Sequence, residues 1–200
     1  MRDYSEINRK AYDKKAKCYD ETLDGKFTEG FKSLLLDNIH VRDNDSILDI
    51  GCGNGKLLSG IEKSNLIQGF GVDISPEMIR YAKECYPKFN FVVSGCENIP
   101  FEDNSMDIII VCAAYHHFPS VDLFAKEAKR LLKQNGSLYI AEIYLPSIVR
   151  HIVNLFLPLS KDGDVKLYSP KEIVNTFTNA GFYVERIIKK GHIQIVQIHI

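Results

Sequence analysis

The chain has 200 residues, of which 45% are hydrophobic and 26% are charged. This composition is ordinary for a globular protein, it excludes intrinsic disorder, collagen and a long coiled coil, and the length favours one domain. Because 25 basic and 26 acidic residues leave a net charge of −1, no strong field would draw a polyanion, and we expect no nucleic-acid partner.

The first ten residues are polar and lack the apolar core of a secretion signal, so we expect the mature chain to start here and to reside in the cytoplasm. The longest apolar stretch, residues 145–159, is broken by Arg150, His151 and Asn154. It is shorter than the roughly 20 residues that a membrane crossing needs. Five separated cysteines without a CxxC pair argue against a disulfide framework and against a zinc site.

Two helices are expected first, over Tyr4–Asp20 and Phe27–Ile39, and together they would form an N-terminal helical cap over residues 1–40. From Ser46 onward, short apolar runs alternate with amphipathic segments, which is the pattern of βα units in a parallel sheet. The expected strands are Ser46–Ile50, Gln68–Asp73, Phe89–Ser94, Asp107–Ala113, Ser137–Tyr144, Tyr183–Lys189 and Ile193–Ile200.

The sequence indicates where two of the helices between these strands begin. Ser75 and Pro76 supply a capping hydroxyl and a proline for the first helical position, and a helix should run from there to about Tyr86. Residues 169–172 form a capping box for a helix that ends near Gly181. The last two strands would then pair through residues 190–192. The fold predicted for residues 1–200 is therefore a single α/β domain with a seven-stranded, mostly parallel sheet, helices on both faces and an antiparallel last strand.

A glycine-rich loop follows the first strand in the run Ile47-Leu48-Asp49-Ile50-Gly51-Cys52-Gly53-Asn54-Gly55-Lys56. In an open parallel sheet, the ligand crevice lies beyond the carboxyl ends of the strands, where the strand order reverses. Glycine lets a ligand approach the backbone closely, although a flexible turn is the simpler alternative. A dinucleotide fingerprint would place its third glycine where this sequence has Lys56.

Asp73 ends the second strand, 18 residues beyond Gly55. A carboxylate there can accept hydrogen bonds from both ribose hydroxyls of an adenosine ligand, or it can merely cap a turn. The G-x-G-x-G pattern led by Asp49 and followed by Asp73 resembles that of class I S-adenosylmethionine-dependent methyltransferases, of the small stand-alone type called methyltransferase type 11. The resemblance extends over about residues 8–189. It implies a Rossmann-like fold, S-adenosylmethionine as cofactor, and methyl transfer to a small molecule by in-line displacement.

The resemblance also implies which residues contact the cofactor. They are Asp49, Gly51, Cys52, Gly53, Gly55, Asp73, Ile74, Met78, Cys96, Glu97, Cys112, Ala113 and, from the N-terminal cap, Tyr19. Gly95 stands where the family often has an acid that binds the adenine amino group, so this contact would fall to the Cys96 backbone, to Glu97 or to water. Tyr12 and Tyr19 could equally anchor an otherwise polar helix.

His116 and His117 follow the fourth strand and are candidates for a general base, which is needed only if the acceptor must lose a proton. Packing or hydrogen bonding to the loop backbone is the alternative. Neighbours on a turn are not expected to face one point, and their spacing is poor for chelation, so we expect one structural histidine and no metal. The apolar insert over residues 145–168 could be a lid over a lipophilic acceptor, a core-packed helix or a dimer contact.

Two other functions stay open. A nicotinamide oxidoreductase would use the glycines and Asp73 but leaves Lys56 unexplained, and a non-catalytic sensor would bind the same cofactor and regulate a partner. Methylation of protein or nucleic acid has little support, because the first 30 residues hold seven basic and seven acidic side chains. The run 112–115 also lacks the Asn-Pro-Pro-aromatic sequence that marks amino-group methylation in related enzymes. The acceptor and the oligomeric state, with a homodimer as one alternative, stay open.

Overall fold

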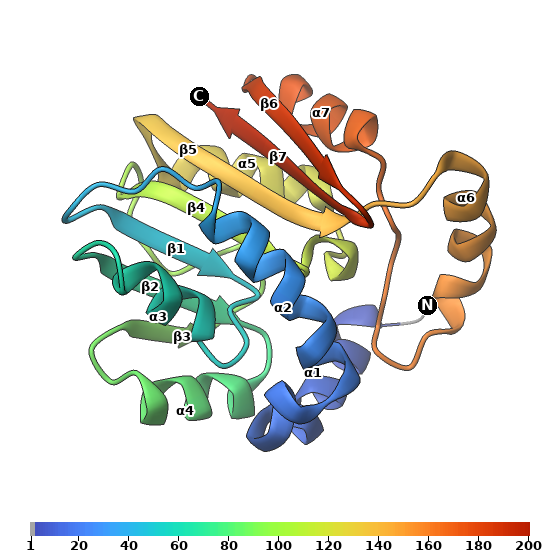
Figure 1. Cartoon of the computed structure of the whole chain (residues 1–200), viewed down its shortest axis with the longest axis horizontal. Helices are drawn as coiled ribbons and strands as arrows, with labels where there is room; N and C mark the ends of the chain where they lie inside the picture. Colours follow the sequence, from blue (N-terminus) through green and yellow to red (C-terminus); the bar gives the residue numbers. More distant parts are fainter. Residues whose placement is uncertain (1–2) are drawn as a thin grey trace.

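The computed structural model describes residues 3–200 and contains one seven-stranded sheet in the order β3-β2-β1-β4-β5-β7-β6 (Figure 1). The strands are β1 (Ser46–Ile50), β2 (Gln68–Asp73), β3 (Asn90–Val93), β4 (Met106–Cys112), β5 (Leu132–Ile143), β6 (Tyr183–Lys190) and β7 (Ile193–His199). Neighbours from β3 to β5 pair in parallel, and β7 is antiparallel to both β5 and β6. The predicted Rossmann-like fold is confirmed.

Six strands begin and end within one residue of their predicted limits, and β5 does not. It begins at Leu132, which pairs with Met106, and the register then shifts before Ser137 pairs with Ile108. The polar residues 133–136 between these pairs have the composition of a turn, which is why the sequence suggested a later start. An irregular pairing of this kind depends on the neighbouring strand and leaves no local signal.

The helices are α1 (Tyr4–Lys15), α2 (Leu23–Leu36), α3 (Lys56–Glu62), α4 (Pro76–Cys85), α5 (Val121–Leu131), α6 (Ser147–Phe156) and α7 (Pro170–Asn179), with 3₁₀ turns η1 (Ala16–Glu21), η2 (Tyr115–His117) and η3 (Leu157–Leu159). The expected caps of α4 and α7 are present: Ser75 accepts from the Met78 amide, and Ser169 forms a capping box with Glu172. The N-terminal limits were wrong. Helix α2 begins at Leu23, four residues before the expected start, because the hydroxyl of Thr22 caps it by accepting from the Gly25 amide at 3.0 Å.

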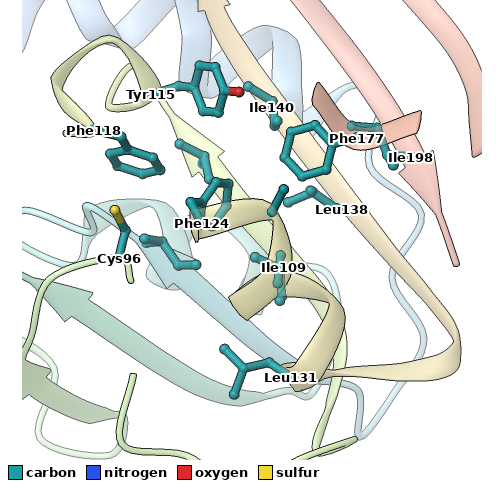
Figure 2. Close-up of a cluster of buried hydrophobic side chains, with 14 of the residues drawn as sticks. Cys96, Ile109, Tyr115, Phe118, Phe124, Leu131, Leu138, Ile140, Phe177 and Ile198 are labelled. Atoms are coloured by element: carbon teal, nitrogen blue, oxygen red, sulfur yellow. The ribbon is translucent and has the colours of Figure 1, made fainter. Parts of the chain in front are cut away.

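The core has two apolar layers, one on each face of the sheet. On one face, Leu138 and Ile140 of β5 contact Phe124 of α5 and Phe177 of α7 (Figure 2). On the other face, alternate residues of the same strands pack against α2, α3 and α4. Continuous apolar runs therefore suit strands that are covered on both sides. Cys96, at one end of the cluster in Figure 2, also lines the cavity described below.

Helix α6 of the insert stands away from the body of the fold in Figure 1. Ile148 is 77% exposed and Leu155 is 75% exposed. The opposite side of the helix is anchored by the buried Arg150, whose guanidinium donates to the Glu172 carboxylate at 2.8 Å. The insert is therefore not the core-packed helix that was one of its expected readings. Over residues 3–200, no helix combines the length and apolar character that a membrane crossing requires.

Candidate active site

The carboxyl ends of β1, β2 and β4 open into a cavity of about 340 Å³. It lies beside the junction of β1 with β4, where the strand order reverses, which is where ligands bind in open parallel sheets. All predicted cofactor residues except Asp49 and Gly55 line it, namely Gly51, Cys52, Gly53, Asp73, Ile74, Met78, Cys96, Glu97, Cys112, Ala113 and Tyr19. The fold therefore brings together predicted residues as far apart in the chain as Tyr19 and Ala113, which are 94 positions apart.

The wall also contains polar side chains that the sequence did not single out, and four of them come from α1 and α2. They are Ser5, Asn8, Thr28 and Lys32, which join Asn54, Ser94 and Asn98 from the loops after β1 and β3. Thr28 and Lys32 are four residues apart and so share one face of α2. That spacing, inside an otherwise apolar stripe, is the signal that could have found them, whereas Ser5 and Asn8 give none.

Gly53 and Gly55 have different tasks although both have a positive φ, of +52° and +78°. A Cβ built on Gly53 would meet no atom within 4 Å, so the bare backbone faces open space at the cavity. A Cβ on Gly55 would lie 2.6 Å from Cζ of Phe91. Gly55 therefore serves the packing of β3 against the loop, and it lies behind the cavity wall.

Asp73 ties the end of β2 to the glycine loop. One carboxylate oxygen accepts from the Gly53 amide at 2.9 Å, and the other accepts from the Ser75 amide at 2.9 Å. Burial raises the pKa of Asp73, and these two amides oppose the rise. Each oxygen can accept more than one hydrogen bond, so the carboxylate still has acceptor capacity toward the cavity.

Asp49 lies just behind the wall, since the next two residues, Ile50 and Gly51, line the cavity. Its side chain is buried, and Oδ1 has no hydrogen-bond partner among residues 3–200. Burial raises the pKa of Asp49 to about 7, with Lys32 opposing the rise and Asp73 adding to it. A buried carboxylate without a partner is costly, and a cation in the cavity would relieve that cost.

His116 and His117 form η2 and face different groups. Nδ1 of His116 lies 2.9 and 3.0 Å from the two carboxylate oxygens of the fully buried Glu142. Burial opposes a charge on His116, but Glu142 and Asp164 outweigh this effect and raise its pKa. Nε2 of His117, which lines the cavity, lies 3.2 Å from the hydroxyl of Tyr12.

Burial lowers the pKa of His117 well below its ordinary value, and the neighbouring His116 lowers it further, while the Gly163 backbone opposes the change. The imidazole of His117 is therefore neutral near pH 7 and can accept a proton. Of the two candidates for a general base, only His117 reaches the cavity.

The expectation that neighbouring histidines cannot face one point is wrong. The two ring centroids are 4.1 Å apart, and both rings approach Asp164. The rings converge because Nε2 of His116 and Nδ1 of His117 both face Oδ1 of Asp164. The carbonyl of His116 also accepts from the amides of Val165 and Lys166, at 2.8 and 3.2 Å, which fixes the segment with Asp164 beside η2.

Residues 48–140 match a family model described as "Methyltransferase domain". The ubiquinone/menaquinone biosynthesis C-methyltransferase UbiE of Campylobacter jejuni is 26% identical over 175 residues, which cover 72% of this chain and 73% of that protein. The demethylmenaquinone methyltransferase of Chlorobaculum tepidum is 33% identical over 100 residues, which cover 50% of this chain and only 41% of that protein.

A solved chain in a complex with the Haloferax volcanii Trm112 methyltransferase activator has the same fold, with a TM-score of 0.82 at 20% identity, and the match covers 94% of this chain and 96% of that chain. Residues 48–140 therefore resemble a methyltransferase domain, and the whole chain has the fold of solved S-adenosylmethionine-dependent methyltransferases. The family implies a cofactor that carries an ammonium, a carboxylate, a ribose and an adenine.

The cavity of this chain fits such a cofactor. The orphaned Oδ1 of Asp49 suits a nearby cation, and the open space at Gly53 suits a ligand in contact with the backbone. Ala113, at the end of β4, has φ +52° and donates its amide to Ala141 at 2.8 Å. A left-handed alanine is strained, and strain of this kind clusters at ligand sites.

The five cysteines are free thiols. Burial raises the pKa of Cys96 to about 12 and raises the pKa values of Cys52 and Cys112 as well. All three cavity cysteines are therefore protonated at neutral pH and are poor nucleophiles. They contribute to the shape of the cavity and do not supply a covalent step.

No residue of the insert 145–168 is among the described residues that line the cavity, so the lid stays a prediction. The second half of the insert instead lies against α1. The Asn8 amide donates to the Asp162 carbonyl at 2.9 Å, and the Lys15 ammonium contacts the Asp162 carboxylate at 2.6 Å. The insert therefore supports the N-terminal cap from behind.

Proposed function

We propose that the chain transfers the methyl group of S-adenosylmethionine to a small organic molecule bound beside His117. The observation that carries this proposal is the cavity at the strand-order reversal, with its open backbone at Gly53, the orphaned carboxylate of Asp49 and the acceptor capacity of Asp73. These three features suit a ligand that is cationic at one end and carries a sugar at the other.

Each part of the cofactor then has a candidate partner in the wall. Asp73 would accept from the ribose hydroxyls, and the segment at Cys96 and Glu97 would contact the adenine. Asp49 would face the ammonium group, which lowers the pKa of a neighbouring carboxyl. The ammonium of Lys32, which is bonded to Glu29 at 3.0 Å and lines the cavity, would pair with the cofactor carboxylate.

Bound S-adenosylmethionine supplies an activated methyl group, so the protein need only hold the acceptor in line and keep water out. Tyr12 and Tyr19 of the cap contribute to this exclusion, because both line the cavity opposite the glycine loop. The neutral His117 would take the proton of an acceptor that must lose one. Its Nε2 is held by the hydroxyl of Tyr12, so the two side chains would act on the acceptor together.

We further propose an acceptor with an aromatic ring. Phe118, Pro119 and Ala114 give the cavity an apolar end beside His117. Two of the relatives are named as methyltransferases of quinone biosynthesis, which is the same class of acceptor. A cytoplasmic location and a homodimer belong to this proposal as expectations.

Calorimetric titration tests the proposed cofactor, using S-adenosylmethionine, its demethylated product and NADH. We expect one equivalent of each sulfur compound and no NADH. Replacement of one charged hydrogen-bonding group costs about 1.5–3 kcal/mol, so Lys32→Met should weaken binding by roughly tenfold or more. Lys26→Met, on an exposed position of the same helix, is the matched control and should leave binding unchanged.

Two outcomes of this titration would reverse the proposal. Binding of NADH without the methyl donor would favour the oxidoreductase. Tight binding of S-adenosylmethionine, with no label transferred from its methyl group to a panel of aromatic metabolites, would favour the non-catalytic sensor.

A further inference from the structure

The side chains of His116, His117 and Asp164 are all of types that bind metal ions, and they lie close together. His116 and His117 come from η2, and Asp164 comes from the insert. One ligand atom from each lies within 4.8 Å of the other two. Oδ1 of Asp164 is 3.5 Å from Nε2 of His116 and 3.2 Å from Nδ1 of His117.

The contact of Asp164 with His117, at 3.2 Å, lies at the upper end of the hydrogen-bond range, and its contact with His116 lies beyond that range. The 3.5 Å contact exceeds the usual N–H···O range of about 2.7–3.2 Å. Nδ1 of His117 is buried and forms no hydrogen bond of normal geometry with the part of the chain that is described. In a tetrahedral zinc site with bonds of about 2.1 Å, neighbouring ligand atoms are roughly 3.4 Å apart. The two contacts of Asp164, at 3.5 and 3.2 Å, are close to that edge, and the two histidine nitrogens lie within 4.8 Å of each other.

The far side of each ligand is held by a partner of its own. Glu142 binds Nδ1 of His116, and the hydroxyl of Tyr12 contacts Nε2 of His117 at 3.2 Å. The Ser160 hydroxyl donates to the second oxygen of Asp164 at 2.5 Å. Metal-binding histidines characteristically have a carboxylate or another polar group on the second ring nitrogen, which fixes the ring and the tautomer.

The negative charges beside the two histidines also favour a bound cation. Glu142 is fully buried and contacts His116, and the largely buried Asp164 approaches both His116 and His117, so two carboxylates lie beside the histidine pair. A protonated His116 would neutralise only one of them, whereas a divalent cation between neutral rings would balance both. Buried charges of one sign are costly unless they are paired.

We propose that Nε2 of His116, Nδ1 of His117 and Oδ1 of Asp164 bind a divalent first-row transition metal, with zinc as the reference ion and water as the fourth ligand. Two imidazoles and one carboxylate form a donor set that zinc commonly takes in proteins. This inference departs from the sequence expectation of no metal, because that expectation rested on the spacing argument that the structure overturns.

The site would position His117 rather than act on the acceptor. Of the three side chains, His117 lines the cavity, whereas His116 and Asp164 do not. An ion there would fasten the segment around Asp164 to η2 and hold the His117 ring against Tyr12. With Nδ1 on the ion, the neutral ring carries its proton on Nε2 and donates it to the Tyr12 hydroxyl, so the metal-loaded form would serve an acceptor that need not lose a proton. The ion would therefore couple the insert to the site of methyl transfer.

Metal binding is measured on the full chain after treatment with a chelator, by calorimetric titration with Zn²⁺. We expect one equivalent to bind. Asp164→Asn should lower the affinity at least tenfold, and Glu142→Gln should lower it by about 10- to 100-fold, the range for outer partners of metal ligands. Asp162→Asn is the matched control: it is two residues away, and its carboxylate contacts Lys15 rather than the histidines.

A second measurement keeps the test decisive if a variant fails to fold. Co²⁺ added to the unmodified chain should give the visible absorption of a four-coordinate site with nitrogen and oxygen ligands, without a thiolate charge-transfer band. Absence of binding would overturn the proposal, as would a thiolate band or equal affinity in Asp164→Asn and Asp162→Asn. Since no cofactor or acceptor is present, the result is independent of the proposed methyl transfer.

Discussion

Replacing Gly53 with alanine isolates the close approach of ligand to backbone. At φ +52° an alanine must stay in the left-handed region, which costs about 1–2 kcal/mol. The new methyl group meets no protein atom within 4 Å, so no clash adds to this cost. Gly191, in the β6–β7 turn, has φ +60° and the same open space, and it lies outside the cavity. Gly53→Ala and Gly191→Ala should therefore lose the same stability.

Only the Gly53 variant should lose affinity for S-adenosylmethionine, because its methyl group would occupy the space in which the cofactor touches the backbone. We expect at least a tenfold loss, or about 1.4 kcal/mol. Urea unfolding of both variants measures the stability cost, and calorimetric titration measures the affinity. Equal affinity in the two variants would refute the assignment of the glycine loop to the cofactor.

Three further changes test the electrostatics and packing around the site. Burial raises the pKa of Asp49 from 3.8 to about 7. The folded protein therefore holds this proton more tightly than the unfolded chain, and its free energy of unfolding should fall as the pH rises from about 4 to 7, by at most roughly 4 kcal/mol. Asp49→Asn should flatten that part of the stability profile in urea unfolding, and an unchanged slope would contradict the assigned shift. Gly55→Ala should lower the free energy of unfolding by about 2–4 kcal/mol, which is more than Gly53→Ala, because the new Cβ would lie 2.6 Å from Phe91 and the backbone φ is positive. An equal loss in the two variants would contradict this explanation. Phe124→Ala, in the core of Figure 2, should cost about 3–5 kcal/mol without changing cofactor affinity at low temperature, and a loss of affinity in the folded variant would show that the core shapes the cavity.

The sheet could be predicted because its signals are local. Buried parallel strands are short apolar runs, and the caps at Ser75 and Ser169 are written in consecutive residues. The glycine loop and Asp73 were found for the same reason. Asp49 and Gly55 belong to the same motif but do not line the cavity: Asp49 directly precedes the lining residues Ile50 and Gly51, and Gly55 packs against Phe91, which a sequence pattern cannot reveal.

The parts of the site that were missed depend on contacts between distant segments. Lys32 reaches the cavity only because α2 packs across the carboxyl ends of β4 and β5, as its contacts with both strands show. The expectation that His116 and His117 face different points rests on their spacing alone. Their convergence requires Asp164, which lies 47 positions after His117 and is placed by backbone hydrogen bonds to His116.

The way the cap is attached indicates how a ligand enters. Helix α1 and η1 contact the rest of the chain largely through polar groups, such as the bond of the Ser75 hydroxyl to Asp13 at 2.6 Å and that of the Asn54 amide to Asp20 at 3.0 Å. Their apolar contacts are confined to a small cluster around Tyr19 and Met78. The main body, in contrast, is closed by two large apolar layers. Because α1 and η1 contribute little to these layers, whereas α2 contributes Phe31 and Leu35, we expect α1 and η1 rather than α2 to move when a ligand enters.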